Sequence, residues 1–193
     1  MDNVNYFAYI WFHSYKMENK IQTSAIKIIQ ASSKEHFDAT RRLFREYFEL
    51  LYTLPEMTLN MDLQSHSGEL ADLENGKYVP PLGAILLSTS GDQYTGVVAL
   101  RKLEKDTCEM KRLYVRPQYR GESIGLHLAQ RIVQKGRDLG YTKMRLDTHP
   151  HLQKAYRLYQ SIGFYDIPQY NQNNVPGAIF MEIDLTSSPR EME

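Results

Sequence analysis

One stretch, residues 109–140, most constrains what this chain can fold into. It opens with a strand-like run that ends in Leu113-Tyr114-Val115. A turn containing Arg120 and Gly121 follows, and apolar residues then recur at helical spacing as far as Leu139. A strand, a small-residue turn and a helix in this order direct several backbone N–H groups, and the positive end of the helix dipole, toward one point. The stretch therefore predicts a binding site for a phosphate or pyrophosphate group.

The residues before this stretch predict a strand, helices and a hairpin. A short β-branched run predicts a strand over 25–30, and Ser32 with Glu35 forms a candidate capping box for a helix over 33–52. A weaker helical pattern covers 62–73. Strands over 83–88 and 96–103, separated by a turn, predict an antiparallel hairpin that continues into a third strand over 108–115.

The residues after the turn predict a parallel crossover. A helix over 122–139 links the strand at 108–115 to a strand over 143–148, so the two strands should be parallel neighbours. A helix that starts at Pro150 and ends at Gly163, a loop or weak hairpin over 165–177 and a last strand over 178–185 complete the order. The predicted fold class is α/β, with a mixed central sheet in which an antiparallel meander precedes a parallel β-α-β crossover, flanked by helices.

The length of 193 residues suits one domain. We expect this domain over 25–185, between a partly ordered N-terminal extension over 1–24 and a frayed tail over 186–193. The extension has an aromatic run at 6–12 that is too short to span a bilayer, and no signal-peptide pattern. It is a candidate contact for assembly, including a possible homodimer.

Charge and cysteine content narrow the partners. The 23 basic and 23 acidic residues cancel, which argues against a nucleic-acid footprint. Cys108 is the only cysteine, so the sequence has no intrachain disulfide and no cysteine-based metal cluster. We therefore expect a cytoplasmic protein that binds no metal and no membrane.

Two motifs point to a family. The turn is not a Walker loop, because it lacks Gly-Lys-Ser/Thr, and it lacks the three glycines of a dinucleotide fingerprint. Arg120-Gly121-Glu122-Ser123-Ile124-Gly125 resembles the Arg/Gln-x-x-Gly-x-Gly/Ala turn of the GNAT superfamily of acyl-CoA-dependent N-acetyltransferases, with Ser123 where the first glycine is usual. Ala155, Leu158-Tyr159 and Gly163-Phe164 resemble that family's second signature, in the same order and separation.

The resemblance implies that acetyl-CoA is the co-substrate and assigns residues to it. The pantetheine arm would lie along the strand at Leu113, Tyr114 and Val115, paired like an extra strand, with a backbone N–H facing the thioester oxygen. The pyrophosphate would lie on the turn. The implied cofactor-binding residues of the turn are Arg120, Gly121, Glu122, Ser123, Ile124 and Gly125.

The resemblance also implies catalytic residues, each with an alternative. Tyr159 is the candidate general acid, because a phenol is protonated at neutral pH and can donate to a departing thiolate. It also lies on the apolar stripe of its helix, where a tyrosine usually packs in the core. Glu109 is the candidate base; the alternative is a solvated strand residue paired with Lys111 or Arg112.

Two histidines flank Pro150 after the strand at 143–148. His149 and His151 would lie at the carboxyl end of a parallel strand, where α/β sheets place ligands. Either side chain could relay a proton, or serve only as a capping or surface residue.

The predicted function is the transfer of an acetyl group from acetyl-CoA to a primary amine, by direct attack in a ternary complex. The acceptor would be a small molecule or a peptide. In the family the acceptor pocket is built by variable segments, which correspond here to 47–73 and 165–177. The alternatives are a non-catalytic acyl-CoA-binding sensor and an interaction module.

Overall fold

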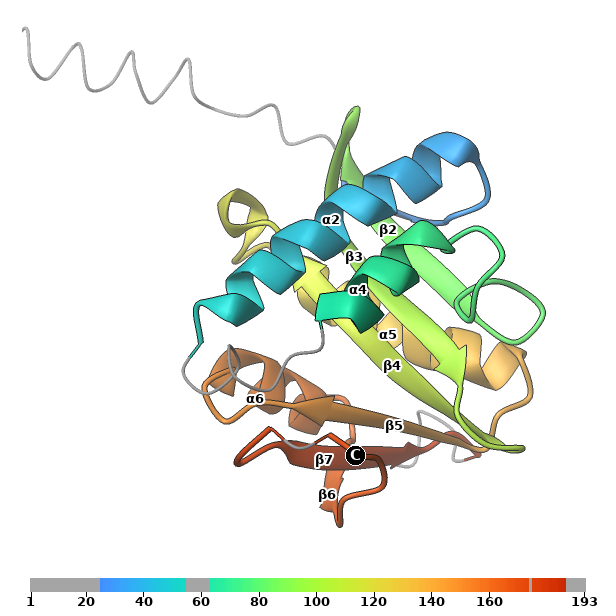
Figure 1. The fold of residues 1–193 in the computed structure, drawn as a ribbon, viewed down its shortest axis with the longest axis vertical. Coiled ribbons are helices and arrows are strands. Elements are labelled where there is room, and N and C mark those ends of the chain that lie inside the picture. Colours follow the sequence, from blue (N-terminus) through green and yellow to red (C-terminus); the bar gives the residue numbers. More distant parts are fainter. Residues whose placement is uncertain (1–24, 55–62, 174, 187–193) are drawn as a thin grey trace, which may run out of the picture.

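A seven-stranded mixed sheet forms the centre of the protein (Figure 1). The computed structural model describes residues 25–54, 63–173 and 175–186. The predicted extension over 1–24 and nearly all of the predicted tail lie outside the described residues. The strands are β1 (Lys27–Gln30), β2 (Ala84–Ser90), β3 (Gln93–Lys102), β4 (Thr107–Val115), β5 (Lys143–Thr148), β6 (Tyr165–Ile167) and β7 (Ile179–Asp184). The helices are α2 (Lys34–Tyr52), α4 (Leu63–Ala71), α5 (Ile124–Asp138) and α6 (Gln153–Ser161), with a 3₁₀ turn, η1 (Pro117–Tyr119).

The strand pairing confirms the predicted fold class. The sheet order is β1-β2-β3-β4-β5-β7-β6, and β1 to β4 pair antiparallel. β4 and β5 are parallel, joined through α5, and β7 is antiparallel to both β5 and β6. The meander and the crossover therefore meet at β4.

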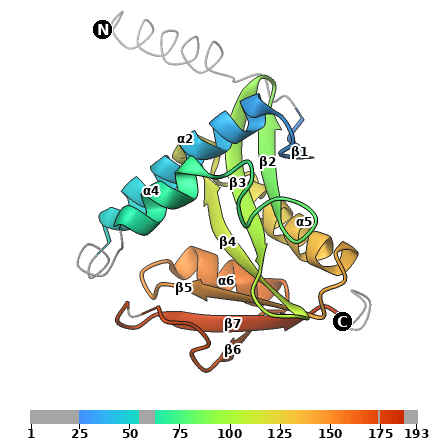
Figure 2. The ribbon, with the colours of Figure 1, turned by 45° about the vertical axis from the view of Figure 1, so that its right-hand side comes forward.

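Helices cover both faces of the sheet. Figures 1 and 2 show α2 and α4 over one face and α5 behind the other. The side chains of α5, including Leu128 and Ile132, pack in one apolar core together with Tyr159 of α6. Leu43 and Phe44 of α2 pack in a second core on the opposite face. Each face of the sheet thus has its own core.

Two helix starts differ from the sequence prediction. Ser33, not Ser32, is the N-cap of α2, because its side chain accepts a hydrogen bond from the backbone N–H of His36. The helix α6 begins at Gln153, three residues after Pro150, with Leu152 as its cap residue. A proline is permitted at a first helical position but does not by itself start a helix there.

The predicted end of α6 is confirmed. Gly163 has a φ of 98°, in the left-handed region that favours glycine. The backbone N–H of Phe164 then donates to the carbonyl of Tyr159, and the two rings lie 5.9 Å apart between centroids. This cap fixes the direction in which Tyr159 enters the core.

A buried ion pair fixes α4 to the sheet. Arg112 of β4 donates two hydrogen bonds, of 2.8 and 3.1 Å, to the carboxylate of Glu69 on α4. Lys77 contacts the same carboxylate at 3.0 Å, and the side chain of Glu69 is only 3% exposed. Burial raises the pKa of Glu69, but the hydrogen bond and charge of Arg112, together with Lys77, lower it from 4.5 to about 2.

We predict that Glu69→Gln lowers the free energy of unfolding at pH 7 by about 3 kcal/mol. A carboxyl group whose pKa is lowered in the folded state stabilises the fold above its unfolded pKa and loses this stabilisation as the pH falls toward the folded value. The difference between wild type and variant should therefore shrink between pH 4.5 and about 2. Urea unfolding over a pH series measures it.

Glu74→Gln is the matched control for this experiment. Glu74 pairs with Arg41 at 3.0 Å, but its side chain is 42% exposed. An exposed pair of this kind contributes at most about 1 kcal/mol. A Glu69→Gln effect that stays constant over the acidic range would contradict the role given to the carboxylate charge.

Candidate active site

An open seam between β4 and β5 is the central feature of the site. The two strands pair at three positions only, the last being Glu109 opposite Arg145. Beyond this point β4 runs on to Val115 and β5 to Thr148 without pairing to each other. The facing backbone N–H and C=O groups of the two strands are therefore available to a ligand that enters between them.

A β-bulge in β4 contributes to this divergence. The β3–β4 register shifts between Val97 and Ala99, and Arg112 has a φ of 61°, in the left-handed region. A bulge bends the strand that carries it, and a non-glycine residue with positive φ persists only where its surroundings hold it. The ion pair with Glu69 and the rings of Phe48 and Tyr47, 4.7 and 6.0 Å from the guanidinium, hold Arg112 in place.

The turn after β4 presents a row of free backbone donors. Within the described chain, no hydrogen bond is made by the backbone N–H groups of residues 121–126, whereas the N–H of His127 donates to the carbonyl of Ser123. Gly121 and Ser123 have positive φ values of 93° and 57°. Added side-chain atoms on Gly121 would meet nothing within 4 Å, so the turn is open. Free N–H donors at the N-terminus of a helix such as α5 are suited to bind an anion.

Side chains hold this turn at the mouth of the seam. Arg120 donates from Nε to the carbonyl of Val115 at 2.9 Å, and its guanidinium lies 5.8 Å from the ring centre of Tyr114. A Cβ placed on Gly125 would lie 3.5 Å from a Leu158 methyl carbon and 3.8 Å from one of Val115. The start of α5 therefore lies beside the end of β4 and beside α6. The structure thus brings together the predicted residues of the turn and those of the strand.

Tyr159 spans two environments. Its ring belongs to the core under α5 and is 8% exposed. Burial raises the pKa of its hydroxyl, and the neighbouring Tyr47 and Asp147 raise it further. Among the described residues, none hydrogen-bonds to this hydroxyl. The phenol is therefore protonated, and it lies within electrostatic range of groups on the α2 side of the sheet.

Glu109 is a buried, fully partnered carboxylate. Its side chain is 0% exposed and accepts from Arg101 Nε at 2.6 Å and from the Tyr170 hydroxyl at 2.8 Å, while Lys111 Nζ lies 3.6 Å away. The alternative of a solvated strand residue is therefore wrong. Arg101 on β3 and Tyr170 on the loop after β6 are its main partners, in addition to the expected Lys111.

A second carboxylate, not singled out from the sequence, lies beside the seam. Asp147 accepts from Lys111 Nζ at 2.5 Å and from Asn173 Nδ2 at 2.6 Å. Burial raises its pKa, but the charge and hydrogen bond of Lys111, together with Asn173, lower it, so the group is ionised. Arg145 and Asp147 alternate along β5 with the buried Met144 and Leu146. This period of two could have indicated a polar face here.

The two histidines lie together after β5. His149 is buried, its ring stacks on that of His151 at 5.0 Å, and its Nδ1 accepts from the backbone N–H of His151 at 3.3 Å. The two predicted roles of these histidines, as a proton relay or as a capping or surface residue, both stay predictions. Among the described residues, no group of three or more His, Cys, Asp or Glu side chains could hold a metal ion, and no helix is long and apolar enough to cross a membrane.

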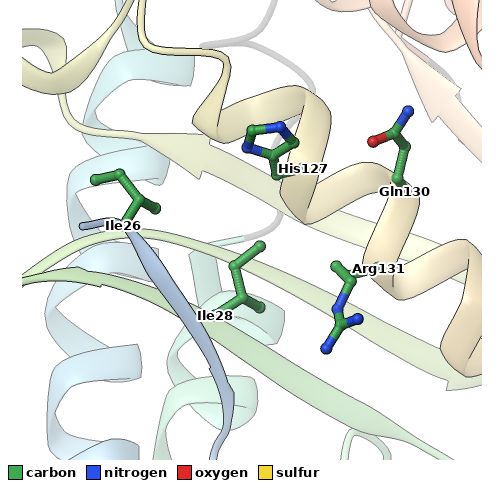
Figure 3. A pocket seen from close by; sticks show the side chains of 5 residues that line it. All are labelled: Ile26, Ile28, His127, Gln130 and Arg131. Carbon is green, nitrogen blue, oxygen red and sulfur yellow. The ribbon is translucent and has the colours of Figure 1, made fainter.

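A pocket of about 290 Å³ lies elsewhere, between β1 and α5 (Figure 3). Ile26 and Ile28 of the first strand segment face His127, Gln130 and Arg131 of α5 across it. The strand β1 is the sheet edge three places from β4, so this pocket is separate from the seam.

The comparisons with known proteins identify the family. The Acetyltransferase (GNAT) family matches residues 37–164. An uncharacterized N-acetyltransferase of Schizosaccharomyces pombe is 35% identical over 172 residues, which are 87% of this chain and 97% of that protein. An N-acetylaspartate synthetase of Danio rerio is 29% identical over 68% of this chain and 44% of that protein.

Solved structures share the fold. An acetyltransferase from Salmonella typhimurium, solved with its cofactor acetyl-CoA, has a TM-score of 0.62 and 18% identity, over 86% of this chain and 97% of that chain. An N-acetyltransferase from Thermoplasma acidophilum, solved with coenzyme A, has a TM-score of 0.60 and 17% identity, over 83% and 99%. The chain belongs to the GNAT acetyltransferase family. It is an acetyl-CoA-dependent N-acyltransferase, with acetyl-CoA as co-substrate.

The residues present fit this co-substrate. The free N–H groups of residues 121–126 suit an anionic pyrophosphate, and the open strand edges of the seam suit the amide groups of a pantetheine arm. Ser123 has the left-handed backbone that the usual glycine would adopt, so its side chain does not prevent this turn from forming.

We predict that Ser123→Gly keeps the acetyl-CoA dissociation constant within about threefold, whereas Ser123→Val raises it by more than about tenfold. Glycine adopts a φ of 57° freely, but a β-branched residue is strained there and will displace the N–H groups. Isothermal titration measures both constants, and melting curves show whether each variant is folded. Equal affinities for the two variants would show that the turn conformation at Ser123 does not govern binding.

Proposed function

We propose that this protein transfers an acetyl group from acetyl-CoA to the primary amine of a small molecule or peptide, by direct attack in a ternary complex. The observation that carries the proposal is the open seam, with free backbone donors at its mouth. The buried, protonated Tyr159 lies within electrostatic range of Asp147, which follows the paired part of β5. Ionised side chains line the α2 side of the same seam.

Backbone groups would hold the donor. Residues Arg120, Gly121, Glu122, Ser123, Ile124 and Gly125 form the turn whose N–H groups would bind the pyrophosphate. The edge of β4 at Leu113, Tyr114 and Val115 would pair with the pantetheine arm. A backbone N–H on this edge would stabilise the charge that develops on the thioester oxygen.

The transfer would require a neutral amine as the nucleophile and a protonated phenol as the general acid. The amine nitrogen attacks the thioester carbonyl carbon, so a C–N bond forms and the C–S bond breaks. The departing thiolate takes the proton of the Tyr159 hydroxyl, and the phenolate regains the proton that the nitrogen sheds as it becomes an amide. The raised pKa of Tyr159 keeps the phenol protonated before each cycle.

In this proposal Glu109 does not itself remove a proton from the acceptor amine. A general base must reach the proton that it removes, and a carboxylate that is 0% exposed beneath Tyr170 cannot reach an acceptor in the described arrangement. We propose that Glu109 positions Lys111, which lies 3.6 Å from one of its oxygens and contacts Asp147 on the other side.

The relatives guide the choice of acceptors. By its name, the Danio rerio protein makes an N-acetylated amino acid, which places α-amino groups first among the amines to test. The alternative of a non-catalytic acyl-CoA sensor is less favoured, because relatives with the name N-acetyltransferase include one matched over 97% of its length.

Release of free thiol from acetyl-CoA across a panel of amines tests the function. The panel should hold amino acids, polyamines, aminoglycosides and short peptides with a free N-terminus. Turnover with at least one amine is expected. Stabilisation by acetyl-CoA in a thermal shift assay, without thiol release for any amine, would support the sensor instead.

We predict that Tyr159→Phe lowers kcat by about a hundredfold or more, which is the usual contribution of a general acid. The acetyl-CoA dissociation constant should change little, because the ring and its packing on Phe164 remain. The matched control is Tyr156→Phe on the same helix, since the Tyr156 hydroxyl contacts Asp166 at 3.0 Å and is exposed. A kcat that Tyr159→Phe leaves unchanged at saturating substrates would reject Tyr159 as the acid.

A further inference from the structure

We propose that Asp147 binds the acceptor: its carboxylate accepts a hydrogen bond from the acceptor's ammonium group and holds the nitrogen beside the seam. The ammonium group releases one proton to solvent water, and the resulting neutral amine is the species that attacks the thioester. Lys111 and Asn173 position this carboxylate. The inference rests on the proposed function and extends it to the group that selects the acceptor. It names as substrates those amines that are protonated at neutral pH.

The place of Asp147 along β5 is the first argument. The last residue of β5 that pairs with β4 is Arg145, opposite Glu109. Asp147 comes two residues later, so its side chain projects from the same face of the sheet but from the part of β5 that faces the open seam. Glu109 lies on the closed part of the ladder.

Access is the second argument. The side chain of Asp147 is 13% exposed, and that of Glu109 is 0% exposed. Among the described residues, each oxygen of Asp147 has one hydrogen-bond partner, Lys111 on Oδ1 and Asn173 on Oδ2. A carboxylate can accept about four hydrogen bonds, so Asp147 can take a further donor without losing either partner.

The neighbouring groups supply the third argument. Tyr47 of α2 and Tyr159 of α6 approach from different elements, and the charge of Asp147 raises the pKa of both hydroxyls. Burial is the larger cause in each case. The carboxylate therefore lies within electrostatic range of the proposed acid, on the side of the seam that α2 borders.

The charge balance indicates what this site would bind. Arg101, Lys111 and Arg112 each already contact a carboxylate, at 2.6, 2.5 and 2.8 Å. These cations are therefore committed to residues of the chain. Asp147 is the carboxylate of this cluster with both an exposed fraction and unfilled acceptor positions beside the seam, so the site favours a cationic amine.

Asp147→Asn is the test, because it keeps the shape of the side chain and removes the charge. We expect the KM for the best amine of the panel to rise about ten- to hundredfold, the usual effect of losing a charge-assisted hydrogen bond. The acetyl-CoA dissociation constant should stay within about threefold of the wild-type value, because the substitution does not touch the turn at 120–125 that is proposed to bind the pyrophosphate. A KM for the amine that does not change would overturn the inference.

Glu182→Gln is the matched control. Glu182 lies on β7 on the same sheet face and is likewise nearly buried between two cations, Lys143 at 3.0 Å and Arg145 at 2.8 Å. It pairs with β5 on the edge away from β4, so the strand β5 lies between it and the seam. The Glu182→Gln variant should have a lower melting temperature than the wild type and the same KM for the amine. Equal rises of KM in both variants would mean that Asp147 acts only through the stability of the fold.

A crystal structure of the wild-type protein tests the inference even if the Asp147→Asn variant does not fold. In a crystal of the wild-type protein with CoA and the best amine, the amine nitrogen should lie about 3 Å from an Asp147 oxygen. A nitrogen bound out of contact with Asp147 would overturn the inference. If the wild-type protein acetylates an amine but the amine KM is unchanged in Asp147→Asn, or the amine nitrogen does not contact Asp147, this inference alone is rejected. A wild-type protein that acetylates no amine would reject the proposed function.

Discussion

The structure depends on where the β4–β5 ladder stops. A parallel pair that continued past Glu109 and Arg145 would fill the backbone donors and acceptors that β4 and β5 turn toward each other. Because the ladder stops there, β4 and β5 leave unpaired backbone edges facing each other. The first turn of α5, with its free N–H groups, lies at the end of β4 next to these edges. The proposed acetyl-CoA site is therefore made of backbone groups, and Ser123 adopts the left-handed conformation that a glycine would take there.

The α2 side of the seam is built in the opposite way, from ionised side chains. Arg101 and Glu109, Lys111 and Asp147, and Arg112 and Glu69 form successive pairs next to the bulge. Buried charges are costly unless paired and hydrogen-bonded, and removing one partner leaves the other uncompensated. We therefore expect this part of the protein to be sensitive to single charge changes, and the turn at 120–125 to be sensitive to changes of backbone conformation.

Local sequence patterns were sufficient for much of the fold. The strand at 143–148 was predicted with its observed bounds, and the cap at Gly163 and Phe164 was predicted with its contact to Tyr159. The fold class was predicted from the order of strands and helices, and the GNAT family from two motifs, and both predictions are confirmed. These features depend on residues that are close in sequence, where spacing carries the information. The roles of individual residues in the donor turn stay predictions.

The side-chain contacts on the α2 side of the seam were not predictable in the same way. Tyr170 and Asn173 lie in a loop without a regular pattern, yet they hydrogen-bond to Glu109 and Asp147, which are 61 and 26 residues away in sequence. Arg101 reaches Glu109 across a strand pair whose register the sequence does not state. Such contacts arise only when the chain is folded, so Arg101 and Tyr170 were missed as partners of Glu109, and the alternative that Glu109 is solvated was wrong.

The short ladder also has a mechanical consequence. Strands β5, β7 and β6 are joined to the meander of β1 to β4 by three paired backbone positions, the α5 crossover, the apolar core under α5 and side-chain contacts such as that of Tyr170 with Glu109. A molecule that hydrogen-bonds to both edges of the seam would complete the missing part of the ladder and couple two halves that otherwise share little backbone pairing. Acetyl-CoA would then act as a temporary strand of the sheet, and the rigidity of the whole domain would rise and fall with each catalytic cycle.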